Sequence, residues 1–202
     1  TPMATRPRQA PAANTTVSRF EAALIINRWL MFQLGAPAGF SDLKPLLKDI
    51  REETAADGQS RFYGALAGRT GLKIDPEKLA EYDRRVLAHE SRLAASRGLF
   101  TFKYYQYLAL LVTEILLDRL TSDPALLCHD INTYMVERQH GDGIFYDIEP
   151  VTTEDLRLFA FYMATGSGKT LVMHANYWQI LYYLRHSAHP EALVRRDDRR
   201  HA

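Results

Sequence analysis

The chain has little of what covalent cross-links, membrane insertion or strong electrostatic attraction would need. Its 202 residues include one cysteine, Cys128, so an internal disulfide is excluded and the usage fits a reducing cytosol. No run reaches the ~18 uninterrupted apolar residues of a membrane-spanning helix, and the first residues lack the apolar core of a signal peptide. The net charge of +1 gives no overall field toward nucleic acid or a membrane. We therefore expect a cytoplasmic protein without a membrane partner.

The sequence is rich in the residues that build a core. Apolar residues make up 47% of the chain and charged residues 24%, and there are 11 tyrosines and 9 phenylalanines. These values are typical of a globular protein, and the length allows one or two domains. Residues 1–16 are rich in Pro, Ala and Thr, which predicts a disordered tail.

Apolar residues recur at helical spacing along most of the chain. The pattern predicts helices over about 18–34, 41–50, 62–66, 76–97 and 124–137, an apolar helix that ends near Leu120, and a last helix over 171–186. Short apolar runs at 144–146 and 156–163 predict strands. The fold class expected from this order is a mainly α N-terminal region followed by the start of an α/β phosphate-loop domain, incomplete in this chain.

The segment between the second predicted strand and the last helix reads A-T-G-S-G-K-T, residues 164–170. A glycine-rich turn at such a junction suits a triphosphate, because Gly166 and Gly168 let the backbone approach the oxygens closely. The helix start adds unpaired N–H groups and partial positive charge. Lys169, the expected catalytic residue, would bring charge to the β- and γ-phosphates, and the Thr170 hydroxyl would be a Mg²⁺ ligand. The expected nucleotide-binding set is Thr165, Gly166, Ser167, Gly168, Lys169 and Thr170.

The full phosphate-loop pattern is G-x-x-x-x-G-K-[ST], and Met163 occupies the position of its first glycine. Residues 163–170, M-A-T-G-S-G-K-T, resemble motif I of superfamily 2 helicases. They are most similar to the ATPase subunits of type I and type III restriction enzymes and to DEAD/DEAH-box proteins, where a small or apolar residue commonly replaces that glycine. The resemblance implies ATP and Mg²⁺ as cofactors. It also implies a truncated RecA-like lobe over 100–202, with a helical accessory region over 17–99.

The resemblance extends to a second element upstream of the loop. Helicases of this superfamily often carry an aromatic-x-x-Gln element whose amide reads the adenine edge, and residues 103–106, K-Y-Y-Q, loosely resemble it. Gln106 would supply one donor and one acceptor to the base, and Phe102 or Tyr104 could stack on it. An ordinary helix N-terminus explains the same residues equally well.

Two parts that ATP hydrolysis needs do not follow the loop. An acidic residue must hold Mg²⁺ and orient water, and an arginine usually completes the site; in this family both lie well downstream, and the residues after Thr170 contain neither motif. We therefore expect the N-terminal part of a larger ATP-dependent translocase, inactive alone. The resemblance implies that the whole protein acts on nucleic acid, duplex DNA above all, with methyltransferase or nuclease partner subunits in a restriction or phage-defence system.

Two other functions fit the sequence. The loop could belong to another phosphate-loop NTPase, such as a small-molecule kinase or an AAA-type regulator, although these normally have a glycine where Met163 stands. Alternatively, the chain is a non-catalytic helical interaction module with a vestigial loop. Nucleotide titration separates this last function from the first two.

Overall fold

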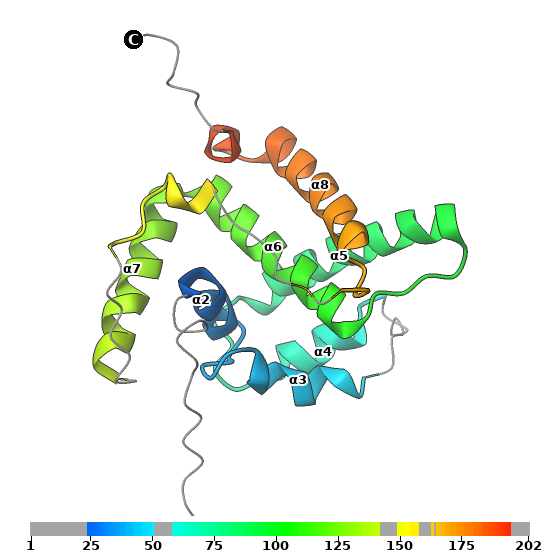
Figure 1. Cartoon of the computed structure of the whole chain (residues 1–202), viewed down its shortest axis with the longest axis horizontal. Helices are drawn as coiled ribbons and strands as arrows, with labels where there is room; N and C mark the ends of the chain where they lie inside the picture. Colours follow the sequence, from blue (N-terminus) through cyan, green and yellow to red (C-terminus); the bar gives the residue numbers. More distant parts are fainter. Residues whose placement is uncertain (1–23, 51–57, 142–148, 158–162, 164, 195–202) are drawn as a thin grey trace, which may run out of the picture.

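The computed structural model describes residues 24–50, 58–141, 149–157, 163 and 165–194. Over these ranges the chain is helical (Figure 1). The α-helices are α2 Ile25–Gln33, α3 Phe40–Lys48, α4 Arg61–Ala67, α5 Pro76–Arg97, α6 Tyr104–Ser122, α7 Pro124–Gly141 and α8 Lys169–His186; η1 Asp155–Arg157 and η2 Pro190–Leu193 are short 3₁₀ helices. The β pairing in these ranges is one isolated antiparallel bridge between Leu34 and Leu72.

The expected start of an α/β domain, RecA-like by resemblance, is wrong: the described part of the chain has helices and no sheet. Leu156 and Arg157, the first residues of the strand predicted over 156–163, lie in η1 instead. A short apolar run does not by its pattern distinguish a strand from a helix. A strand is also stable only when other strands pair with it, and the described residues form no sheet that Leu156 and Arg157 could join. Residues 158–162 and the other predicted strand, 144–146, lie outside the described residues, as does the tail 1–16.

Most of the predicted helices are present, and their ends have local causes. Helix α5 covers the predicted range 76–97. Asp75 caps it by accepting hydrogen bonds from the N–H groups of Glu77 (2.9 Å) and Lys78 (3.2 Å), and Pro76 suits the first helical position. Gly98 follows with φ of 84°, a value that favours glycine and ends the helix.

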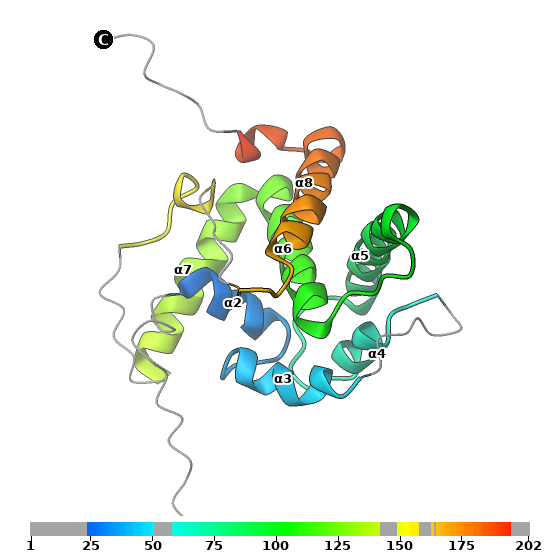
Figure 2. The same ribbon diagram turned by 45° about the vertical axis from the view of Figure 1, so that its right-hand side comes forward.

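Helix α6 lies at the centre of the molecule, with α2, α5, α7 and α8 packed around it (Figures 1 and 2). The sequence predicted such a position, because apolar residues cover most of this helix. Its buried apolar residues face several neighbours at once: Tyr107, Leu108, Leu110, Leu111, Ile115, Leu116, Leu117 and Leu120.

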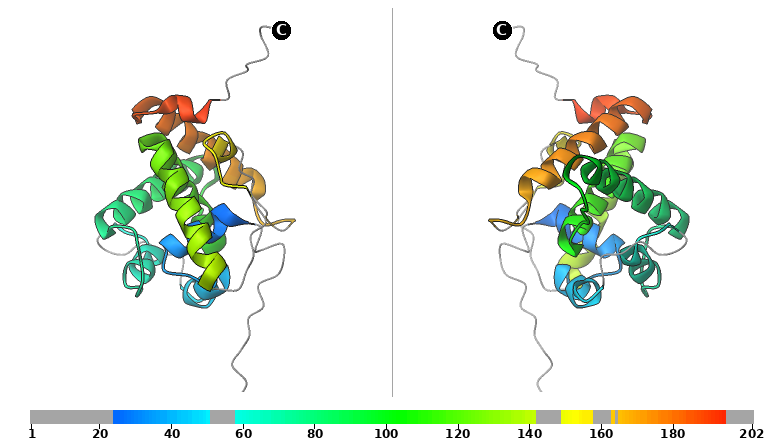
Figure 3. Two further views of the ribbon diagram at one scale, coloured as in Figure 1. Left: turned by 90° about the vertical axis from the view of Figure 1, so that its left-hand side faces the viewer. Right: turned by 90° about the vertical axis from the view of Figure 1, so that its right-hand side faces the viewer.

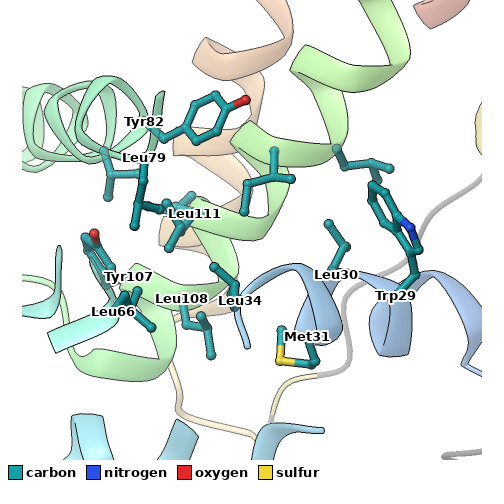
Figure 4. Close-up of a cluster of buried hydrophobic side chains, with 14 of the residues drawn as sticks. Trp29, Leu30, Met31, Leu34, Leu66, Leu79, Tyr82, Tyr107, Leu108 and Leu111 are labelled. Carbon is teal, nitrogen blue, oxygen red and sulfur yellow. The ribbon is translucent and has the colours of Figure 1, made fainter. Parts of the chain in front are cut away.

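Side chains from α2, α4, α5 and α6 meet to form the core that Figure 4 shows. Trp29 and Leu34 come from α2 and its end, Leu79 from α5 and Leu111 from α6, and each is almost fully buried. Burying large apolar side chains of this kind stabilises the fold by roughly 1.5 to 3 kcal/mol each. Within the described ranges, no helix is long and apolar enough to cross a membrane.

Candidate functional site

The glycine-rich segment of the sequence lies directly before α8, at the edge of the molecule in Figure 3. Gly166 and Gly168 have φ of 78° and 86°, which is the region that favours glycine. Gly168 is left-handed, with ψ of 31°, and Lys169 is the first residue of the helix. Successive residues of opposite hand make a concave stretch of main chain whose N–H groups can converge on an anion.

The N–H groups at this helix start are not used by the protein. In the part of the chain that the structure describes, those of Gly168, Lys169 and Thr170 donate to no acceptor. The next two, of Leu171 and Val172, donate to the Gly168 carbonyl at 2.9 and 3.1 Å. The side chains of Lys169 and Thr170 are exposed. Donors, positive charge and a hydroxyl are therefore available together, and they fit the phosphates and the Mg²⁺ of a nucleotide.

The structure brings Gln106 to this loop, although 61 residues separate it from Ser167. Gln106 is the third residue of α6, and its Oε1 accepts a hydrogen bond from the Lys103 N–H at 3.0 Å. Its Nε2 donates to the Ser167 carbonyl at 2.8 Å. The same nitrogen lies 2.5 Å from where a Cβ on Gly168 would be. The amide therefore joins α6 to the loop, and a role in reading adenine stays a prediction.

The aromatic residues predicted to accompany Gln106 lie in other surroundings. Phe102 is only 1% exposed and packs edge-on against Phe100, with ring centroids 5.3 Å apart. Tyr104 stacks on Phe40 at a centroid distance of 6.4 Å. Phe102 is thus part of the core, and Tyr104 already has an aromatic neighbour.

Sequence reasoning missed a buried polar cluster that joins α8 to α5 and α6. The Glu114 carboxylate, 1% exposed, accepts hydrogen bonds from Arg85 Nε (2.8 Å), the Tyr183 hydroxyl (2.9 Å) and Gln179 Nε2 (2.8 Å). Burial raises the pKa of Glu114, but the neighbouring His89, the Arg85 charge and the hydrogen bonds from Gln179 and Arg85 together outweigh it, so the pKa is lowered. A glutamate within a leucine-rich helix was the available signal, because a buried carboxylate needs donors.

A second buried carboxylate holds α4 against α5 and α6. Asp83 is fully buried and accepts a hydrogen bond from the Tyr107 hydroxyl at 2.6 Å. It also accepts from the Ser60 hydroxyl and from the Ser60 N–H, the latter at 2.8 Å. Ser60 in turn caps α4 by accepting from the Tyr63 N–H at 2.9 Å. Burial is the main reason why the pKa of Tyr107 is raised.

Neither buried cluster resembles a metal centre. Among the described residues, no group of three or more His, Cys, Asp or Glu side chains is placed to hold a metal ion. The Mg²⁺ predicted at Thr170 would take most of its ligands from phosphate and water oxygens, so one protein hydroxyl is enough for it. Comparison of the chain with protein-family models, curated proteins and solved structures finds no match.

Proposed function

We propose that the chain binds ATP with Mg²⁺ at the loop formed by Thr165, Gly166, Ser167, Gly168, Lys169 and Thr170. One observation carries the proposal: three successive N–H groups at the start of an 18-residue helix donate to no described protein acceptor, next to an exposed lysine. A helix N-terminus with free N–H groups and a cation binds anions of high charge. Bound ATP·Mg²⁺ supplies a phosphoryl group that can be transferred to water.

Each residue of the loop has a distinct part in this proposal. The N–H groups of Lys169 and Thr170 bind phosphate oxygens, together with the partial positive charge of the α8 N-terminus. The Lys169 ammonium neutralises negative charge on the terminal phosphates, and the Thr170 hydroxyl binds the metal ion. Gly166 leaves space above the loop, since a Cβ there would meet no atom of the described residues within 4 Å.

We further propose that the chain is the ATP-binding part of a helicase-like translocase that acts on nucleic acid, with duplex DNA as the expected substrate. Methyltransferase or nuclease subunits are the expected partners, in a restriction or phage-defence system. This proposal rests on the resemblance of M-A-T-G-S-G-K-T to motif I of superfamily 2 helicases. Another phosphate-loop NTPase would use the same residues for the same nucleotide contacts.

A helical interaction module is the second candidate, and α8 favours it. Met173 and Tyr177 are one turn apart on this helix and are 67% and 60% exposed. Neighbouring apolar side chains on a surface helix are a feature of protein-binding faces. An interaction module needs no nucleotide. A titration with Mg·ATP therefore decides between nucleotide binding and this second candidate.

Titration calorimetry of the purified chain with Mg·ATP tests nucleotide binding. We expect wild type to bind and Lys169→Ala to lose affinity by about 10- to 100-fold, since a hydrogen bond to a charged group is worth about 1.5 to 3 kcal/mol. Lys44→Ala is the matched control, because Lys44 is also exposed but lies on α3. Equal affinities of wild type and Lys169→Ala would contradict the proposal, and absence of binding to wild type would leave the interaction module.

A further inference from the structure

Gln106 is held at both ends of its side chain by main-chain groups. Its carbonyl oxygen accepts from the Lys103 N–H, which closes the first turn of α6, and its nitrogen donates to the Ser167 carbonyl. The residue as a whole is 6% exposed. It is a buried cross-link between the start of one helix and the loop that precedes another.

This arrangement leaves the amide little capacity to recognise a base. A glutamine amide has two N–H donors and two acceptor lone pairs, and one of each is used here inside the protein. If Gln106 turned toward an adenine edge, the Lys103 N–H and the Ser167 carbonyl would both lose their partner. A polar group left unpaired in a buried place costs free energy that the new contacts would have to offset.

The amide is placed where it can fix the shape of the loop. Ser167 is followed by Gly168, whose left-handed conformation turns the chain into α8. Because the Gln106 nitrogen lies 2.5 Å from the position of a Gly168 Cβ, the amide packs directly over that glycine. The hydrogen bond to Ser167 and this contact hold the turn that presents the N–H groups of Lys169 and Thr170 outward.

We propose that Gln106 is a positioning residue for the phosphate loop and that it does not select the base. In its absence the loop samples other conformations, and polyphosphate affinity falls with the population of the competent one. The loss is the same for every ligand that carries the phosphates, whichever base is attached. This inference about affinity rests on the proposed nucleotide binding, whereas the effect on loop order does not.

Two substitutions distinguish the hydrogen bond that the Gln106 nitrogen donates from the one that its oxygen accepts. Gln106→Glu keeps the acceptor for the Lys103 N–H, as glutamate does in a capping box, but removes the donor to the Ser167 carbonyl. Gln106→Leu removes both hydrogen bonds. Gln33→Glu makes the same chemical change at a half-buried glutamine on α2 and serves as the control for a changed net charge of the protein.

The binding measurement compares Mg·ATP, Mg·GTP and Mg·tripolyphosphate by calorimetry. We expect Gln106→Leu, which adds no charge beside the phosphates, to weaken all three by the same factor, at least roughly 2- to 12-fold, the net worth of one hydrogen bond. Gln106→Glu should weaken all three at least as much, because it also brings a negative charge to the loop. The control should leave all three unchanged. A variant that weakens ATP while GTP and tripolyphosphate stay unchanged would show base reading and overturn the proposal, as would a variant with unchanged affinities.

Amide hydrogen exchange, measured without any ligand, tests independently whether Gln106 orders the turn at Gly168. The Leu171 and Val172 N–H groups bond to the Gly168 carbonyl, so their exchange reports the order of the turn. We expect Gln106→Glu and Gln106→Leu to speed this exchange relative to the Leu79 N–H, which bonds to the Asp75 carbonyl in α5. An unchanged ratio would refute positioning. If wild type binds no tripolyphosphate, the proposed function fails, and the exchange ratio alone decides the role of Gln106.

Discussion

Replacing Glu114 by glutamine should destabilise the protein far more than the same change at an exposed glutamate. The three residues that hydrogen-bond to the carboxylate, Arg85, Tyr183 and Gln179, are donors at 2.8 to 2.9 Å. His89 Nε2 lies farther off, 3.8 Å from Glu114 Oε1. A glutamine at 114 has one acceptor oxygen, so its NH₂ group must face at least one donor. Gln179 can turn to accept from it, but then loses its own hydrogen bond to the Leu110 carbonyl.

Glu114→Gln should lower the free energy of unfolding by about 2 to 4 kcal/mol. Part of this loss comes from removing the negative charge that faces Arg85, and the rest from leaving one buried polar group without a partner. Equilibrium unfolding in urea at neutral pH, followed by far-ultraviolet circular dichroism, measures it. Glu81→Gln is the control, because Glu81 pairs with the same guanidinium but is 39% exposed. That change should cost no more than about 1 kcal/mol. Equal costs at the two positions would refute the assignment of Glu114 as the buried anchor of α8.

The free energy of unfolding of wild type, compared with that of Glu114→Gln, should depend on pH in a direction that the Glu114 pKa defines. The pKa of Glu114 is lower in the folded protein than its ordinary value, so its contribution to stability is present above about pH 4.3, the unfolded value. It is lost as the pH falls through the lower, folded pKa. The difference in the free energy of unfolding between wild type and Glu114→Gln should therefore shrink as the pH falls below about 4.3. A difference that grows on acidification would contradict this assignment.

Two further pairs of substitutions test the local geometry. Gly168→Ala should lower the melting temperature more than Gly166→Ala, because both positions have positive φ but only a Cβ at 168 meets a buried amide nitrogen, at 2.5 Å; equal melting temperatures would mean that this contact is unimportant. Asp83→Asn should cost about 1 to 3 kcal/mol in urea unfolding, because its NH₂ group must face either the Ser60 N–H or the two hydroxyls that now donate to Asp83, those of Ser60 and Tyr107. Asp75→Asn should be nearly neutral, since asparagine caps a helix as well as aspartate, and a similar loss at both positions would contradict the burial argument.

The sequence predicted the helices well because their signals are local. Asp75, Pro76 and Gly98 mark the two ends of α5 without reference to any other part of the chain. The expected strand was wrong at Leu156 because an apolar run says how deeply a segment is buried and little about its backbone hydrogen bonds.

For the site, sequence reasoning found the loop and singled out Gln106 but could not find the bond between them. A resemblance to a known motif names residues, whereas the partner of a buried amide depends on how α6 and the loop pack. The carboxylate cluster around Glu114 was missed for a similar reason. Its donors are 29 to 69 residues away in sequence, and no spacing rule connects them.

The central place of α6 has a consequence for how the chain is made. During synthesis the N-terminal helices emerge first, so α6 can pack on α2 and α5 while α8 is still in the ribosome. Until α8 arrives, the apolar side of α6 that it covers is open to water and to other chains. Chaperones that bind apolar segments have their main opportunity in that interval, and slow translation of residues 169–186 would prolong it.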